Sequence, residues 1–251
     1  MKRWIIFCVA ILIPQTPWAA DIQAILQWSH RVELSTPVSG VIQAVSVEVG
    51  ERVKAGQLLL SLDTTSYQAR VDANRFEITR LIAEADEAKR DLDRIQELYD
   101  RTVTSTADLD QAKLRLVNGQ SRRSEARARL RQNQKALDDA SIRAPFDAIV
   151  IIRQAEPGQS VAATLQSQML LTLAKSGEMI ARTHLTAPQM VNLKAGQAVT
   201  VRVSGNSYDG KIKTLGLEPS INKDESVYPV DVVFPCKETL RAGTQALVVL
   251  P

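Results

Sequence analysis

Aromatic side chains are scarce in this chain, in which Phe, Trp and Tyr together make up 4% of the 251 residues. Ligand pockets are lined mainly by apolar and aromatic side chains, so this shortage disfavours a small-molecule enzyme. Histidine is also scarce. His30 and His184 lie far apart in the sequence, outside any nucleophile or metal-ligand motif. We therefore expect a protein that is not an enzyme and that needs no cofactor or metal.

The chain also lacks a strong charge excess and a cysteine pair that could form a disulfide. Its net charge is +3, and Lys2 and Arg3 supply two of these charges in a segment that we expect to be removed. The near-neutral remainder gives no electrostatic basis for binding nucleic acid. Removal of that segment would also remove Cys8 and leave Cys236, which we expect to be a buried or half-buried apolar residue.

The only long apolar run near the start, Trp4 to Ile13, is too short to cross a bilayer as a helix. Two basic residues precede it, and the small pair Ala19-Ala20 follows it before Asp21. This order is typical of a secretory signal, so we predict a signal peptide over residues 1–20. Trp18 is bulky for a position that prefers a small residue, which leaves retention as a membrane anchor as the alternative.

Two parts of the chain repeat each other across a long insertion. Both contain a proline, a β-rich triplet and a later turn, although Ala148 stands where the first part has Gly40. If that turn needs a positive φ, Ala148 is strained. We predict that residues 35–63 and 141–175 are two halves of one β-sandwich. The matching segments are 36–42 with 144–150, 49–53 with 157–161, and 59–62 with 170–173.

The insertion, residues 64–140, contains no proline and one glycine, Gly119, and its composition favours helix. Apolar residues recur at seven-residue spacing on both sides of the polar, β-branched segment 101–106. This spacing predicts an antiparallel coiled-coil hairpin whose arms each reach about 50 Å. The recurring residues are Val71, Ile78, Ala85, Leu92 and Tyr99 in the first arm and Leu109, Leu116, Leu130 and Leu137 in the second.

Three polar residues interrupt the apolar seam of this hairpin: Asn74, Asn133 and Arg123. Folding the two arms back about the tip places Asn74 nearly opposite Asn133. A buried Asn pair lowers stability but fixes the register of a coiled coil, so we consider these two residues a register pair. The alternative is that both lie near the base of the hairpin and contact water.

The remaining sequence predicts a lead-in strand over residues 21–34 and a small β-barrel domain over residues 176–251. Thr186-Ala187-Pro188 predicts the start of a short helix that runs to about Leu193. The expected barrel strands are 199–203, 211–217, 230–234 and 246–250.

The predicted fold class is therefore α+β, with a helical hairpin inserted in a split β-sandwich and followed by a barrel. This order resembles the membrane fusion proteins, the HlyD-like periplasmic adaptors, whose sandwich is lipoyl-like. The residues that carry the resemblance are Pro37–Ile42, Val49–Leu59, Ile142–Asp147 and Leu193–Gln197. Longer members of that family have a further membrane-proximal β-domain, which we expect to be missing here or reduced to a stub.

The resemblance extends to the hairpin tip. Adaptors of this family that dock onto TolC-like channels carry an Arg, a Leu four residues later and a Ser seven further, and Arg94, Leu98 and Ser105 have this spacing. The alternatives are structural: Ser105 can cap a helix with Asp108, Arg94 can be a solvated charge, and Leu98 can belong to the seam. Together the three residues predict a channel-docking tip.

The resemblance implies a periplasmic adaptor associated with the inner membrane, in which several copies form a ring between an inner-membrane transporter and a TolC-like outer-membrane channel. The transporter could be of the RND type or the ABC type, including a type I secretion exporter. A more distant alternative is a lipoyl or biotinyl carrier. Such a carrier needs a lysine at the turn between the two halves, where this chain has Asp63-Thr64-Thr65 and the hairpin.

Overall fold

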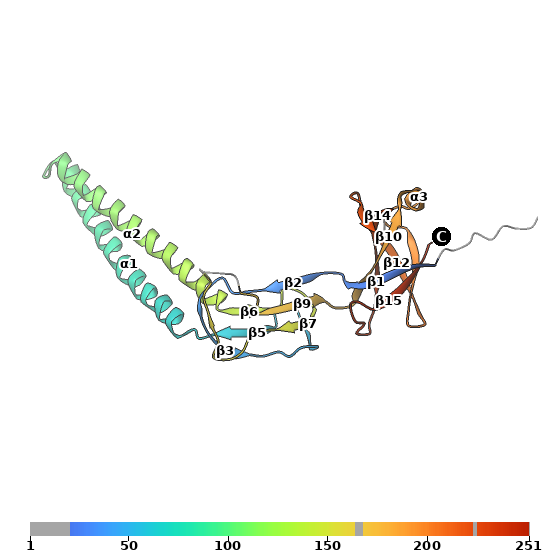
Figure 1. The fold of residues 1–251 in the computed structure, drawn as a ribbon. Helices are drawn as coiled ribbons and strands as arrows, with labels where there is room; N and C mark the ends of the chain where they lie inside the picture. Colours follow the sequence, from blue (N-terminus) through green and yellow to red (C-terminus); the bar gives the residue numbers. More distant parts are fainter. Residues whose placement is uncertain (1–20, 164–167, 223–224, 251) are drawn as a thin grey trace, which may run out of the picture. The chain divides into compact units, whose positions relative to one another are not determined.

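The computed structural model describes residues 21–163, 168–222 and 225–250, so the predicted signal peptide lies outside the described residues. The chain divides into two units (Figure 1). One unit is Arg31–Ala174, and the other combines Met1–His30 with Lys175–Pro251. The first unit holds a β-sandwich and two long helices, and the second holds a β-barrel.

Two four-stranded sheets form the sandwich, with strand orders β2-β9-β7-β4 and β6-β5-β3-β8. Each sheet contains strands from both repeated segments, so neither half forms a sheet without the other. The strands are β2 (Arg31–Leu34), β3 (Gly40–Val45), β4 (Arg52–Val53), β5 (Leu58–Leu62), β6 (Ser141–Arg143), β7 (Ala148–Arg153), β8 (Ser160–Val161) and β9 (Leu171–Lys175).

The two halves bind each other through reciprocal backbone hydrogen bonds. Val150 donates its N–H to the Glu51 carbonyl at 3.0 Å and accepts the Gly50 N–H at 2.8 Å. In the other half, Ile42 donates to the Gln159 carbonyl and accepts the Gly158 N–H, both at 2.8 Å. Equivalent positions of the two halves thus exchange the same bonds, as expected for a repeated sequence that folds into one domain.

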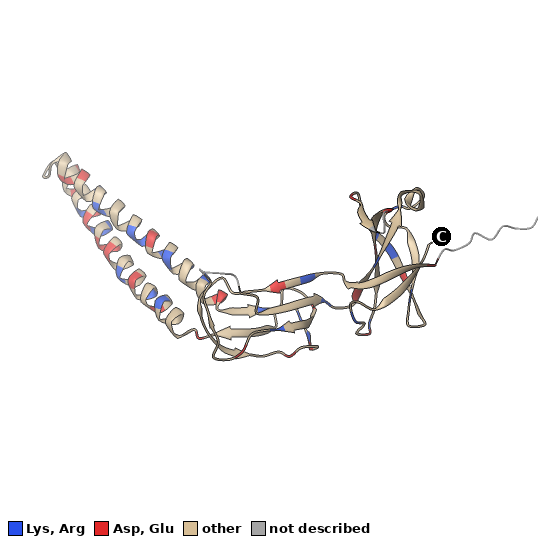
Figure 2. Ribbon diagram, viewed as in Figure 1, with Lys and Arg blue, Asp and Glu red and all other residues tan. Residues whose placement is uncertain are grey.

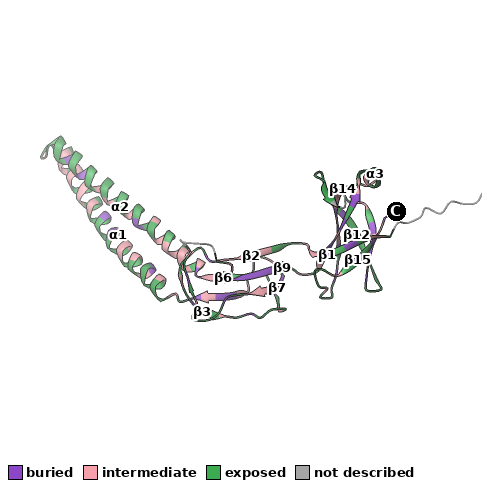
Figure 3. Cartoon of the chain, viewed as in Figure 1, coloured by how far each residue is buried: buried purple, intermediate pink, exposed green. Residues whose placement is uncertain are grey.

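The sandwich core is aliphatic, and its strands are the most buried part of this unit (Figure 3). Leu60, Leu62, Leu171 and Leu173 are fully buried. The condition for strain at Ala148 is not met, because neither Ala148 nor its counterpart Gly40 has a positive φ. Both positions begin regular strands, where any residue fits.

Two long helices follow the first half of the sandwich: α1 (Thr65–Asp100, 36 residues) and α2 (Thr106–Asp139, 34 residues). They lie side by side and antiparallel, joined by residues 101–105 (Figure 1). Charged residues of both signs occur along both helices (Figure 2). The buried residues of the pair are Val71, Leu81 and Ala85 on α1 and Leu109, Ala112 and Ala126 on α2.

Gly119 marks a close approach of the two helices. A Cβ atom added at Gly119 would lie 3.3 Å from the Cα atom and 3.6 Å from the Cβ atom of Ala85. The first distance is tighter than ordinary contact, so the pairing of a glycine with an alanine lets the backbones pack at this level. This is the physical reason for a glycine in an otherwise strongly helix-favouring segment.

Six strands of the second unit close into a barrel, in the order β10-β1-β15-β11-β12-β14 with β14 pairing back to β10, and β13 extends it beside β14. Phe234 is buried in its core and contacts Tyr208. The elements are β1 (Asp21–Trp28), β10 (Glu178–Thr186), α3 (Ala187–Met190), β11 (Ala198–Val203), β12 (Asn206–Leu215), β13 (Ser220–Asn222), β14 (Glu225–Pro235) and β15 (Gln245–Val249).

The predicted lead-in strand, residues 21–34, is wrong as a single element. A bend at Ser29-His30 divides it into β1, which pairs with β10 and β15, and β2, which pairs with β9 in the sandwich. The segment before the bend is a strand of the barrel and not part of a separate domain. The predicted short helix begins at Ala187 but ends at Met190, three residues earlier than expected.

Candidate functional site

The tip of the helix pair is a tight turn, residues 101–105, closed by backbone hydrogen bonds. The Thr102 N–H donates to the Tyr99 carbonyl at 2.8 Å, and the Val103 N–H donates to the Leu98 carbonyl at 2.9 Å. Thr102 has φ +59°, in the left-handed region. That conformation costs a residue with a Cβ atom roughly 1–2 kcal/mol, and a β-branched residue rarely adopts it.

Ser105 begins α2 as its N-cap. The Asp108 N–H donates to the Ser105 hydroxyl at 3.2 Å, and the Ser105 N–H donates to the Asp108 carboxylate at 3.2 Å, which completes a capping box. The hydroxyls of Ser105 and Thr104 also donate to this carboxylate, at 2.6 and 2.9 Å. The hydrogen bond from the Ser105 hydroxyl, followed by that from Thr104, lowers the pKa of Asp108.

Arg94 lies on the exposed surface of α1, three residues after its ion-pair partner Asp91. Asp91 also accepts a hydrogen bond at 2.6 Å from Arg115 on α2. Asp91 is the more buried partner, because its side chain is 21% exposed while that of Arg94 is 70% exposed. The ion pair with Asp91 thus orients the Arg94 guanidinium, whose remaining N–H groups stay accessible to a partner.

The three residues of the predicted docking motif differ in how available they are. Arg94 and Ser105 are exposed, whereas Leu98 is half-buried. Val103, which the sequence motif does not include, is 70% exposed in the turn. The available signal was that residues 101–105 contain one apolar residue among four polar ones.

Asn74 and Asn133 meet across the two helices. The Asn133 amide donates to the Asn74 side-chain oxygen, and both side chains are half-buried. The position of this pair agrees with the fold-back that the heptad spacing predicts. The third polar seam residue, Arg123, is also half-buried, and its Nε atom finds no hydrogen-bond partner among the described residues.

The junction where a carrier lysine would stand has a structural role instead. Asp63 accepts the Thr65 N–H at 2.9 Å at the start of α1, and hydrogen bonding from Thr65 lowers the Asp63 pKa. Lys54 precedes β5, whereas the junction follows it, and Lys54 pairs with Asp147 at 3.0 Å. The sequence between β5 and α1 therefore supports the helix start.

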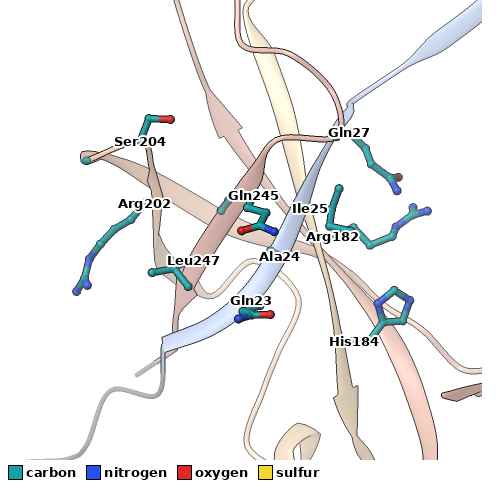
Figure 4. A pocket seen from close by; sticks show the side chains of 13 residues that line it. Gln23, Ala24, Ile25, Gln27, Arg182, His184, Arg202, Ser204, Gln245 and Leu247 are labelled. Atoms are coloured by element: carbon teal, nitrogen blue, oxygen red, sulfur yellow. The ribbon is translucent and has the colours of Figure 1, made fainter. Parts of the chain in front are cut away.

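A groove of about 720 Å³ crosses the outside of the barrel over β1 and β15 (Figure 4). Ile25 and Leu247 lie on its surface, and Arg182 and Arg202 line its two sides. Both arginines already bind carboxylates. Arg182 donates to Asp231 at 2.6 and 2.8 Å, and Arg202 contacts Asp21 at 3.2 Å.

Within residues 21–163, 168–222 and 225–250, no group of three or more His, Cys, Asp or Glu side chains is placed to bind a metal ion. None of the helices in this described part combines the length and apolar character that a membrane crossing requires. Cys236 is buried, as its sequence context predicted.

The sandwich and barrel define the fold of a membrane fusion protein. Residues 30–175 match the model of the CzcB-like barrel-sandwich hybrid domain. Because this match covers more than half of the chain, the protein belongs to the family of membrane fusion proteins that carry this domain. The resemblance seen in the sequence is thereby confirmed.

Curated relatives agree with this assignment. The macrolide export protein MacA of Yersinia pestis is 28% identical over 230 residues, which cover 84% of this chain and 62% of the relative. The pyoverdine export membrane fusion protein PvdR of Pseudomonas aeruginosa is 29% identical over 218 residues, with coverage of 80% and 56%. The chain thus spans about six tenths of the length of these relatives.

Solved structures show the same fold. The membrane fusion protein Spr0693 from Streptococcus pneumoniae R6 superposes with a TM-score of 0.72 at 18% identity, covering 92% of this chain and 97% of that one. A MacA–MexA chimera that contains the α-hairpin domain of Pseudomonas aeruginosa MexA superposes with a TM-score of 0.65 at 21% identity, covering 91% of this chain and 79% of that one.

Proposed function

We propose that this protein is the periplasmic adaptor of a tripartite efflux or secretion system and joins an inner-membrane transporter to a TolC-like outer-membrane channel. The observation that carries the proposal is the insertion of two helices, of 36 and 34 residues, into the sandwich of a membrane fusion protein. A helix pair that projects about 50 Å buries little surface per residue. Its value is its reach toward a distant partner.

In this proposal the two helices form a coiled coil whose tip binds the channel through Arg94, Leu98 and Ser105. Arg94 and Leu98 are one helical turn apart, so they lie on the same side of α1. Ser105 contributes first by capping α2, because its hydroxyl accepts the Asp108 N–H and its own N–H donates to the Asp108 carboxylate. The register pair Asn74 and Asn133 fixes the alignment of α1 with α2. The motif residues on the two helices therefore remain adjacent at the tip.

The β-domains of several copies pack side by side in a ring around a conduit in the periplasm, next to the inner membrane. A signal peptide over residues 1–20 would deliver the chain there. Relatives named for macrolide export and pyoverdine export support a role in export. They leave the transporter open between the RND and ABC types, including a type I secretion exporter. Co-purification of the inner-membrane partner identifies its class.

A lipoyl or biotinyl carrier is the competing function, and the junction residues argue against it. Asp63 and Thr65 form the start of α1, and Lys54 pairs with Asp147. A carrier lysine must be free to enter an active site. Mass spectrometry of the intact protein tests this alternative, which predicts a lipoyl or biotinyl adduct on a lysine, whereas the adaptor function predicts an unmodified mass.

The docking role is tested by Leu98→Asp, which places a charge on the apolar part of the proposed contact. We expect substrate export to be abolished, while the amount of the adaptor and its own delivery to the periplasm stay normal. Val117→Asp is the matched control, because Val117 is 55% exposed and lies on α2 away from the tip. Arg94→Glu tests the same face without altering a half-buried position. Normal export by both tip variants would overturn the assignment.

A further inference from the structure

The turn at the tip engages most of its polar side chains internally. The hydroxyls of Thr104 and Ser105 donate to Asp108, and the Thr102 hydroxyl donates to the Arg101 carbonyl at 2.7 Å. Val103, the one apolar residue of the segment 101–105, points its side chain to solvent and is 70% exposed. An exposed valine contributes little to the free energy of folding, because apolar side chains stabilise a fold through burial.

The backbone that carries Val103 is fixed in a costly conformation. Thr102 has φ +59°, although it is β-branched and has no glycine-like freedom. Hydrogen bonds to the Tyr99 and Leu98 carbonyls on one side, and the capping box of Ser105 on the other, hold this conformation. Strained residues that their surroundings hold in place cluster at binding sites, where they keep a contact preorganised.

We propose that the turn 101–105 is a preformed device that presents Val103 to the exit channel, and that Val103 inserts into an apolar socket at the channel's periplasmic end. This inference rests on the docking function proposed above and adds a contact outside the Arg94, Leu98 and Ser105 motif. Leu98 is half-buried whereas Val103 is 70% exposed, so Val103 is the more accessible of these two apolar residues. The fitting partner surface is a pocket the size of one isopropyl group, surrounded by polar groups.

The test measures binding of the full-length protein to a purified TolC-like channel from the same organism, held in detergent. Val103→Ala removes two methyl groups and should weaken binding about tenfold, and Val103→Asp should weaken it at least a hundredfold. Val117→Asp is the matched control and should bind within about twofold of the parent. Thermal unfolding should be unchanged in all three variants. Parental affinity of Val103→Asp would overturn the inference.

The role of the turn conformation is tested separately with Val103 left in place. Thr102→Pro cannot adopt a positive φ and removes the N–H that donates to Tyr99, so the turn must change. We expect it to bind as weakly as Val103→Ala while its helix content by circular dichroism stays the same. Thr102→Asn tolerates the left-handed region and should retain binding. Equal affinities of the two variants would refute preorganisation by Thr102.

The failure of this inference can be told apart from the failure of the proposed function. If Leu98→Asp abolishes binding and Val103→Asp does not, docking stands and the role of Val103 falls. If the unmodified protein does not bind the channel, or if Leu98→Asp binds as the parent does, the proposed docking function itself fails.

Discussion

Asn74 and Asn133 are a half-buried pair, and replacing them by leucine, singly and together, distinguishes their effect on stability from their effect on the register of the two helices. In the parent, the Asn133 amide donates to the Asn74 oxygen between the two helices. Each single substitution leaves the other amide without this partner. The double substitution, Asn74→Leu with Asn133→Leu, removes both polar groups and extends the apolar seam.

The magnitudes follow from the half-buried position of both side chains. A half-buried leucine contributes about 1 kcal/mol. Losing the hydrogen bond and leaving one amide unpaired costs about 1.5 kcal/mol. Each single variant should therefore be less stable by about 0.5 kcal/mol. The double variant, which leaves no orphaned amide, should be more stable by about 1 kcal/mol, so the coupling energy of the cycle is about 2 kcal/mol.

Urea unfolding followed by helix circular dichroism measures these energies, and a disulfide reports the register. A Cβ atom at Gly119 would lie 3.6 Å from that of Ala85, within the range that a disulfide spans. Ala85→Cys with Gly119→Cys, in a background of Cys8→Ala and Cys236→Ala, should crosslink efficiently in the parent. A slip by one heptad would separate the two positions by about 10 Å.

We expect the double leucine variant to be more stable but to crosslink less completely, because nothing polar then opposes a shifted register. Two results would refute the reasoning. One is additive energies for the single variants, which would mean that the two amides do not interact. The other is a crosslinking yield equal to that of the parent, which would mean that the pair does not set the register.

Three further predictions concern the barrel and the helix start. Burial is the largest single influence on Asp231 and would raise its pKa, but the hydrogen bond and charge of Arg182, together with Thr214 and Lys213, outweigh it and lower that pKa. The pair therefore stabilises above about pH 4 and is lost on further acidification. Asp231→Asn should cost about 1–2 kcal/mol at pH 7 by chemical unfolding, because the Arg182 side chain is 38% exposed, and the loss should shrink below pH 4. Ser105→Ala should destabilise α2 by about 1 kcal/mol, whereas Ser105→Asn should keep the cap, as helix unfolding will show. Gly216→Ala should lower the melting temperature by an overpacking cost of roughly 1–3 kcal/mol, because a Cβ atom there would lie 2.6 Å from the Pro229 side chain.

Local and periodic features were the most predictable from the sequence. The seven-residue spacing placed the helix pair, and its symmetry about residues 101–106 placed Asn74 opposite Asn133. The repeated halves predicted a shared sandwich because a proline, a turn glycine and a following valine recur in both at one constant offset. The N-cap at Ser105 follows from a short motif, and the structure shows the capping box with Asp108.

Pairings between distant segments could not be predicted in this way. β1 pairs with β10 and β15, more than 150 residues away, and nothing in its own alternation distinguishes a barrel strand from a sandwich strand. The turn at the tip is a second case. The left-handed Thr102 and the exposed Val103 depend on how two helix ends meet, and a polar, β-branched segment does not reveal that geometry.

Photo-crosslinking from single positions of the helix pair tests the channel-docking function most directly. A photoreactive phenylalanine analogue is placed at Leu98 near the tip or at Phe76 near the base, where the native aromatic ring is 75% exposed. In cells that express the full-length protein, we predict that position 98 crosslinks to the TolC-like channel and that position 76 does not. An equal yield from both positions, or a channel crosslink from position 76 alone, would contradict docking through the tip.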